Sequence, residues 1–98
     1  MGRFKKFDNE KIQPTLISPS FIQGTAEVLT FGAKKYGKDN WKKCKDRSRY
    51  EDALMRHLLE YLQGKKIDKE SGLSHLYHMS CNLMFLEYFD KKGKDWKH

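Results

Sequence analysis

Apolar residues recur at helical spacing in three stretches of the chain, over residues 18–37, 48–62 and 71–89. No stretch alternates between apolar and polar positions as a half-buried strand does. Each stretch presents an apolar stripe that must be covered, which predicts helices packed on one another. The sequence therefore predicts an all-α fold, a small antiparallel bundle of three main helices.

Several residues predict where the helices begin and end. The first helix is expected to start around Pro19, which suits the first helical position. A capping box formed by Ser20 and Gln23 is an alternative start. Gly37 is expected to end this helix, and Ser48 is expected to be the N-cap of the second.

The remaining segments are expected to be irregular. Residues 1–17 show no clear period and are interpreted as an extended arm, and residues 90–98 as a basic tail. Residues 38–47 are expected to form a loop between the first two helices. Gly24 and Gly32 each weaken the first helix by about 1 kcal/mol, unless close packing needs them. The 98 residues are expected to form a single domain.

Composition adds an expectation of self-association. Hydrophobic residues make up 38% of the chain and charged residues 34%, so the chain is very polar for its size. A domain of this length buries only roughly two-thirds of the surface of its unfolded chain. Three helices of this length leave an apolar face uncovered, and we expect a homo-oligomer to complete the bundle.

The net charge and the hydropathy of the chain indicate which kinds of partner to expect. The formal net charge of +7 favours phosphate-bearing partners. The lysine clusters are typical of solvated surface, and no nucleic-acid-binding motif is visible, so a nucleic-acid partner is not expected. No membrane is expected, because no stretch approaches the roughly 20 apolar residues of a membrane helix. Without a secretory signal or a disulfide framework, we expect a cytoplasmic protein.

The candidate chemistry lies on helix faces that are polar within apolar surroundings. On the second helix, His57 and Glu60 are three residues apart and share a face. On the third, His75, His78 and Asn82 form one polar stripe. Polar lines of this kind are typical of bundles that enclose a ligand or metal site between facing helices.

Each of these features also has a simpler interpretation. Glu27, which aligns with Lys34 on the first helix, is equally well explained as an exposed charge. Glu60 could be no more than a surface partner of Arg56. Asp68 is better explained as the cap of the third helix than as a ligand.

Three groups of residues stand in a specific order and spacing. They are Ala26 to Gly37 with Asn40-Trp41; Ser48-Arg49-Tyr50, Asp52-Ala53 and Arg56-His57-Leu58; and Asp68, Glu70-Ser71-Gly72-Leu73, His75-Leu76, His78 and Cys81-Asn82-Leu83. With these groups the chain resembles a phage family of dATP/dGTP diphosphohydrolases over roughly residues 20–89. The resemblance implies that the cytoplasm is that of an infected bacterial host.

The resemblance implies a relationship to MazG-like all-α nucleotide pyrophosphohydrolases, which hold magnesium with two acidic pairs on adjacent helices and form dimers or tetramers. The matching positions here are His57 with Glu60, and His75 with His78. Three of the four carboxylates would thus be histidines. Because Mg²⁺ prefers oxygen ligands, the substitution favours Mn²⁺ or a similar ion, or no metal.

The implied reaction converts a deoxynucleoside triphosphate, purine preferred, to the monophosphate and pyrophosphate. It requires Glu60, His75 and His78 to converge. Glu60 and Glu27 are expected to be catalytic, and a divalent metal, Mg²⁺ or Mn²⁺, is expected to be bound by His57, Glu60, His75 and His78. The triphosphate is expected to contact Lys34 and Lys35, and the base or sugar to accept hydrogen bonds from or donate them to Asn40 and Asn82. Trp41 and Tyr36 are expected to stack on the base, and Arg56 to bind the substrate. The alternative is a non-catalytic protein without a cofactor that sequesters a (cyclic) nucleotide signal of bacterial anti-phage defence.

Overall fold

The computed structural model describes residues 10–93, and within them the regular structure is helical, with a single isolated β-bridge. The predicted all-α fold with three main helices is confirmed. Two short 3₁₀ helices accompany the main ones. In chain order the elements are η1 (Pro14–Leu16), α1 (Pro19–Tyr36), η2 (Asn40–Lys43), α2 (Ser48–Leu62) and α3 (His75–Lys92). Residues 1–9 of the predicted arm and residues 94–98 of the predicted tail lie outside the described residues.

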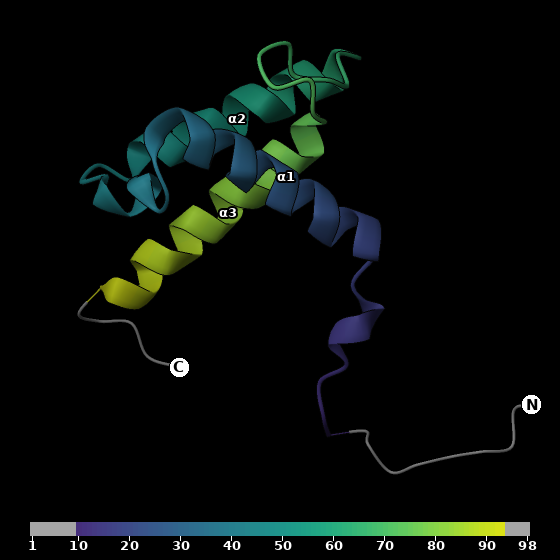
Figure 1. The fold of residues 1–98 in the computed structure, drawn as a ribbon, viewed down its shortest axis with the longest axis vertical. Coiled ribbons are helices and arrows are strands. Elements are labelled where there is room, and N and C mark those ends of the chain that lie inside the picture. Colours follow the sequence, from purple (N-terminus) through teal and green to yellow (C-terminus); the bar gives the residue numbers. More distant parts are fainter. Residues whose placement is uncertain (1–9, 94–98) are drawn as a thin grey trace, which may run out of the picture.

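The helices α2 and α3 form the main pair of the fold. They run side by side in opposite directions, joined by the connection over residues 63–74 (Figure 1). The helix α1 crosses α3 and contacts it less extensively than α2 does. The segment before α1 leads away from the three helices (Figure 1).

The crossing of α1 over α3 is close because Gly24 has no side chain. A Cβ added at Gly24 would lie 2.4 Å from the ring of Tyr77. Beside this contact, the Thr25 hydroxyl donates to Ser80 Oγ at 2.9 Å. The thiol of Cys81 faces the carbonyl of Thr25 at 3.4 Å. A Cβ added at Gly32, in contrast, would meet nothing within 4 Å, so only Gly24 is required by packing.

The bounds of α1 agree with the sequence pattern. Pro19 occupies the first turn, and Gly37, with φ of 99°, follows the last residue. At this φ a residue with a Cβ would be strained, which explains why the helix ends at a glycine. The alternative capping box is wrong, because the Gln23 side chain donates to Glu27 within the helix instead of bonding to a backbone group at its start.

The start of α2 corrects one prediction. Ser48 is the first residue of the helix, and Arg47 takes the N-cap position. The carboxylate of Asp46 accepts hydrogen bonds from the Ser48 backbone N–H and hydroxyl, at 3.1 and 2.7 Å. These bonds hold the pKa of Asp46 below its usual value. Asp46 therefore performs the capping that the sequence assigned to Ser48.

The helix α3 begins and ends later than predicted. Ser74, rather than Asp68, is its N-cap, and the Ser74 side chain accepts from the Leu76 N–H. The residues before it form a turn, with Gly72 at φ of 73° and an antiparallel bridge from Ile67 to Ser74. At the other end the helix runs to Lys92, so the predicted tail starts too early.

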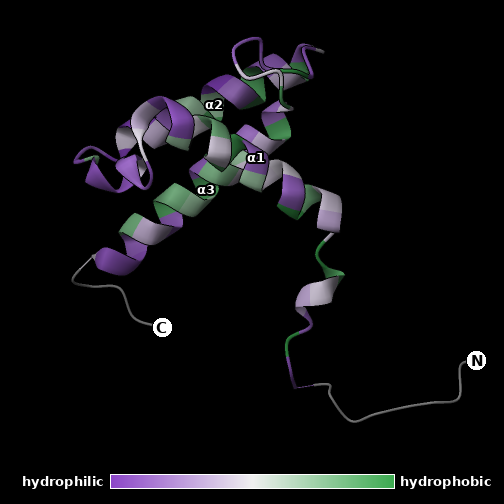
Figure 2. Cartoon of the chain, in the orientation of Figure 1, coloured by the Kyte–Doolittle hydropathy of each residue, from purple (hydrophilic) through white to green (hydrophobic). Residues whose placement is uncertain are grey.

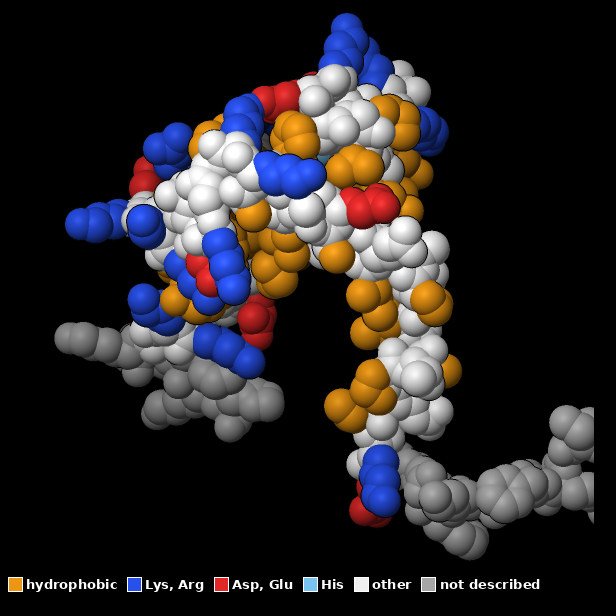
Figure 3. Space-filling view, viewed as in Figure 1, with side chains coloured by type: hydrophobic (Ala, Val, Ile, Leu, Met, Phe, Trp, Pro, Cys, Tyr) orange, Lys and Arg blue, Asp and Glu red, His pale blue; other side chains and the backbone are white. Residues whose placement is uncertain are grey.

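Little of the apolar surface is covered. Among the described residues, the buried hydrophobic side chains are those of Val28 and Cys81, and His75 and Asn82 are buried beside them. Figure 2 shows hydrophobic positions along the helices and the segment before α1, and Figure 3 shows hydrophobic side chains at the surface of the same elements. The large ones are Ile12, Leu16, Ile17, Phe21, Ile22, Tyr36, Met55, Leu59, Leu62, Ile67, Leu76 and Leu83. None of the helices in the described part is long and apolar enough to cross a membrane.

Candidate functional site

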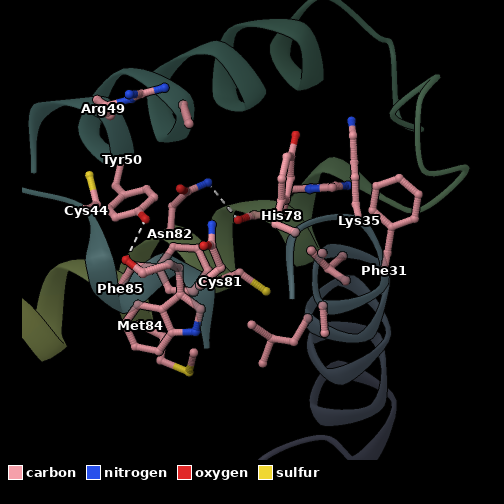
Figure 4. A pocket seen from close by; sticks show the side chains of 18 of the residues that line it. Phe31, Lys35, Cys44, Arg49, Tyr50, His78, Cys81, Asn82, Met84 and Phe85 are labelled. Atoms are coloured by element: carbon pink, nitrogen blue, oxygen red, sulfur yellow. Dashed lines mark hydrogen bonds between the residues drawn. The ribbon is translucent and has the colours of Figure 1, made fainter. Parts of the chain in front are cut away.

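An open cleft of about 1170 Å³ lies between the C-terminal half of α1, η2, α2 and α3. One end holds His78 and Lys35, and the other holds Tyr50, Cys44 and Arg49, with Asn82 between them (Figure 4). The cleft therefore has a histidine end and an aromatic end. Its length and mixed lining suit a ligand with chemically different ends.

The histidine end is built where α2 and α3 lie alongside each other. His57 comes from α2, and His75 and His78 come from the first turn and a half of α3. The Nδ1 atoms of His57 and His75 are 2.7 Å apart, a hydrogen-bond distance. The ring of His57 also stacks on that of His78, with centroids 4.5 Å apart and planes 11° from parallel. The three imidazoles thus form one contiguous group, which we call the histidine cluster.

The connection before α3 brings Asp68 to this cluster. The carboxylate of Asp68 accepts from the Ser71 backbone N–H at 2.9 Å and lies 3.6 Å from His78 Nε2. The Ser71 hydroxyl lies 2.7 Å from the same nitrogen. Sequence reasoning treated Asp68 as a helix cap, although it stood in the third group of matching residues. Its position in the cluster depends on the turn that folds residues 67–74 back on α3.

Glu60 approaches the cluster from the other side. Its Oε1 lies 3.3 Å from His75 Nε2, without the geometry of a hydrogen bond. The His75 side chain is only 1% exposed, and Nε2 is left without a hydrogen-bond partner. A buried polar atom in this state costs roughly 1–3 kcal/mol. In a native protein it calls for an explanation such as a catalytic role, a bound water or a bound ion.

Burial keeps His57 and His78 neutral. It lowers the pKa of His57 to about 4, and the neighbouring His78 and His75 lower it further when charged. Burial likewise lowers the pKa of His78. For Asp68, burial raises the pKa, but the hydrogen bonds from Ser71 outweigh it and the net pKa is lowered. At neutral pH His57 and His78 therefore present neutral imidazoles beside the Asp68 carboxylate.

Basic side chains line the cleft around this cluster. Arg49 and Arg56 lie seven residues apart on α2, and Lys35 comes from the last turn of α1. Lys35 forms an exposed ion pair with Glu70, which joins the end of α1 to the connection before α3. Figure 3 shows further lysine and arginine side chains gathered where α1 ends and η2 lies. These groups give the cleft cationic sites for an anionic ligand.

The aromatic end is a packed cluster rather than an open stacking platform. Trp41 stacks on Phe85, with centroids 4.5 Å apart, and meets Tyr88 edge-on. The Tyr50 hydroxyl donates to the Trp41 carbonyl at 2.8 Å. Burial raises the pKa of Tyr50 to about 12, so this donor keeps its proton. One face of Trp41 is thus already used to fix η2 against α3.

Asn82 lies between the two ends with its amide oriented. It is 6% exposed, and its Nδ2 donates to the His78 carbonyl at 3.0 Å, as drawn in Figure 4. The bond fixes the amide plane, which leaves Oδ1 as an acceptor of defined position. Oriented side-chain amides are typical of sites that recognise the edge of a base.

The structure brings most of the predicted site residues to the cleft. Those that line it are Lys35, Tyr36, Asn40, Trp41, Arg56, His57, Glu60, His78 and Asn82. His75 lies buried beside His57. Glu27 and Lys34 are exposed on α1 and are not among the described residues that line the cleft.

The donor set of the cluster fits a metal ion that accepts nitrogen ligands. His57, Asp68 and His75 each offer one ligand atom, and these atoms lie within 4.8 Å of one another. Imidazole and carboxylate together suit Mn²⁺ to Zn²⁺, whereas Mg²⁺ prefers six oxygen ligands. The cluster is thus a poor match for magnesium.

Comparison with known proteins links the chain to one family. A family model described as dATP/dGTP diphosphohydrolase, N-terminal, matches residues 2–98. A protein of Salmonella phage PMBT28 named dATP/dGTP diphosphohydrolase is 42% identical over 81 residues. The match covers 83% of this chain but only 28% of that relative, so the chain spans less than a third of the relative's length. No solved structure matches the chain.

Proposed function

The chain belongs to the family of dATP/dGTP diphosphohydrolase N-terminal domains, and from this premise we propose that its cleft binds a purine deoxynucleoside triphosphate and hydrolyses it. The products are the deoxynucleoside monophosphate and pyrophosphate. The observation that carries the proposal is the convergence of three histidines, Asp68 and Glu60 at one end of a cleft lined by basic side chains.

The two ends of the cleft suggest how the ligand lies. The triphosphate points toward the histidine end, where Lys35 and Arg56 meet its negative charge. The base and sugar lie toward Asn82 and the aromatic end of the cleft. Asn82 Oδ1 accepts from an exocyclic amine, a group that both adenine and guanine carry.

Glu60 is the group best suited to take a proton during hydrolysis. Water attacks the α-phosphorus, the bond from that phosphorus to the bridging oxygen breaks, and pyrophosphate leaves. The proton released by the water passes to Glu60, whose carboxylate is exposed to the cleft. His75 Nε2 lies 3.3 Å from Glu60 Oε1, so a small shift would let it donate to that carboxylate and orient it. A divalent ion bound at the cluster would neutralise phosphate charge and lower the pKa of the attacking water.

We also propose that the chain acts as a homo-oligomer, in which neighbouring chains cover the exposed apolar side chains of α1 and α2. This fits the small number of buried apolar residues in the described part. Domains of this size with so little core are only marginally stable alone.

The test is a turnover assay with a full set of nucleotides. The purified chain is incubated with each deoxy- and ribonucleoside triphosphate in Mn²⁺, Zn²⁺, Mg²⁺ or chelator, and the products are separated by ion exchange. We expect equimolar pyrophosphate and monophosphate from dATP and dGTP. Glu60→Gln should reduce kcat by roughly 100-fold or more. Glu87→Gln, an exposed carboxylate of α3 paired with Lys91, is the matched control and should keep full activity.

Two results would contradict hydrolysis. The first is recovery of every nucleotide unchanged under all four conditions. The second is equal turnover by the Glu60→Gln variant, which would place the chemistry elsewhere. Unchanged recovery together with tight, metal-independent binding of a linear or cyclic nucleotide would identify a sequestering protein instead.

A further inference from the structure

We propose that His57, Asp68 and His75 bind one divalent transition-metal ion of the Mn²⁺ to Zn²⁺ series, and that this ion ties α2 to α3. The ion-binding proposal does not depend on the proposed hydrolysis. It concerns a site assembled from α2, the connection before α3, and the first residue of α3.

The ligand atoms are close enough to share one ion after a small adjustment. They all lie within 4.8 Å of one another. Two nitrogen ligands of a tetrahedral ion are about 3.3 Å apart, given metal–nitrogen bonds of about 2.05 Å. The His57 and His75 Nδ1 atoms are 2.7 Å apart, so they now share a proton. A separation by about 0.6 Å, with the shared proton moved from Nδ1 to Nε2 of the same ring, would make room for the ion between two Nδ1 lone pairs.

The surroundings of the cluster supply the second shell that metal-bound histidines need. A ligating imidazole usually donates its other N–H to a carboxylate. When His75 binds through Nδ1, its otherwise unpartnered Nε2 faces Glu60 Oε1 at 3.3 Å. His78 stacks on the His57 ring and its Nε2 lies 2.7 Å from Ser71 Oγ, which limits how far His57 can turn. His75 Nε2 is therefore placed beside a carboxylate to which it can donate when Nδ1 binds the ion.

The same donors select against magnesium. Mg²⁺ requires near-octahedral oxygen ligands, and the cluster offers two imidazoles for one carboxylate. Imidazole binds first-row transition ions with an affinity that rises from Mn²⁺ through Co²⁺. The residues thus disagree with the oxygen-only magnesium site that a MazG-like relationship implies.

An ion at this position would also stabilise the fold. The described residues bury few apolar side chains, and α2 and α3 meet at the histidine cluster. An ion bound by both helices in the folded chain alone raises stability by mass action. Ion binding can therefore be measured without any nucleotide or turnover.

The experiment measures binding and thermal unfolding of the chain after chelator treatment. Zn²⁺, Co²⁺ and Mg²⁺ are each titrated by calorimetry, and Co²⁺ is also followed by visible absorption. We expect one Zn²⁺ or Co²⁺ per chain, cobalt bands of a nitrogen- and oxygen-ligated ion, and a raised Tm. Mg²⁺ at the same concentration should leave Tm unchanged.

Two conservative variants localise the ion. Asp68→Asn keeps an acceptor for the Ser71 N–H but loses the charge, and His57→Gln keeps a polar group beside His75. Each should weaken Zn²⁺ affinity by more than about 10-fold, while Glu87→Gln binds as the unmodified chain does. Unchanged affinity in both variants would mean adventitious binding elsewhere and would overturn the proposal. So would equal stabilisation by Mg²⁺, or no binding at all.

Discussion

The Nδ1 atoms of His57 and His75 lie 2.7 Å apart, so one imidazole must donate and the other accept. Burial lowers the pKa of His57 to about 4, so this ring is neutral near pH 7. If His57 donates, the remaining proton of His75 sits on Nε2, which faces Glu60. A single shared proton therefore sets the tautomers of both histidines.

The first prediction concerns the stability of this pair in chelator. His57→Leu leaves the buried His75 Nδ1 without a partner and should lower the unfolding free energy by about 1–3 kcal/mol. Adding His75→Leu removes the orphaned group, so the double variant should be more stable than the sum of the single changes predicts. Urea denaturation of the unmodified protein, the two single variants and the double variant measures the coupling free energy between the two histidines. Strict additivity would show that the 2.7 Å contact contributes nothing.

The second prediction uses the two glycines inside α1. Gly24→Ala places a methyl group 2.4 Å from the Tyr77 ring and should destabilise the protein by about 1–3 kcal/mol through overpacking. Gly32→Ala meets nothing within 4 Å and should stabilise it by up to about 1 kcal/mol through helix propensity. Thermal unfolding of the two variants shows whether each substitution raises or lowers the Tm. The same sign in both variants would argue against the close crossing of α1 and α3.

The third prediction concerns the Cys81 thiol. Burial raises its pKa to about 12, and the side chain is 2% exposed. At pH 8 only about one molecule in 10,000 carries the Cys81 thiolate, the form that alkylating agents attack. Iodoacetamide should therefore label the partly exposed Cys44 first and Cys81 only in urea, as read by mass spectrometry.

The raised pKa of Cys81 also determines how the stability of the protein changes with pH. Because the folded protein holds the Cys81 proton to higher pH than the unfolded chain, stability falls as pH rises above about 9. Cys81→Ala should reduce the slope of stability against pH between about 9 and 11. Rapid labelling of Cys81 in the native protein, or an unchanged slope, would contradict a buried neutral thiol.

The helices were predictable where the local signals agree. For α2, the apolar period and the following Gly64 point to the same range, and the structure has Ser48–Leu62. For α3, polar residues that can begin a helix occur at Asp68, Ser71 and Ser74 alike. The choice among them is made by the bridge from Ile67 to Ser74, a contact that local pattern does not reveal. The start was therefore predicted too early.

Some residues of the candidate site could likewise be predicted from local sequence pattern, and others could not. Helical spacing places His57 and Glu60 on one face of α2, and that expectation needs only the helix period. Whether Glu27 joins them depends on how α1 crosses α3, which is set by Gly24 and Tyr77. Asp68 reaches the cluster through a turn. The periodic residues were thus found from sequence, and those positioned by crossings and turns were not.

The ion pair of Lys35 and Glu70 has a consequence for how the cleft responds to its medium. Both side chains are exposed, 41% and 62%, so the pair contributes roughly 0–1 kcal/mol and weakens as ionic strength rises. A polyanion that enters the cleft competes with Glu70 for Lys35. The wall formed by the end of α1 is therefore held by an exchangeable counter-ion, whereas the buried His75 is shielded from dissolved salt.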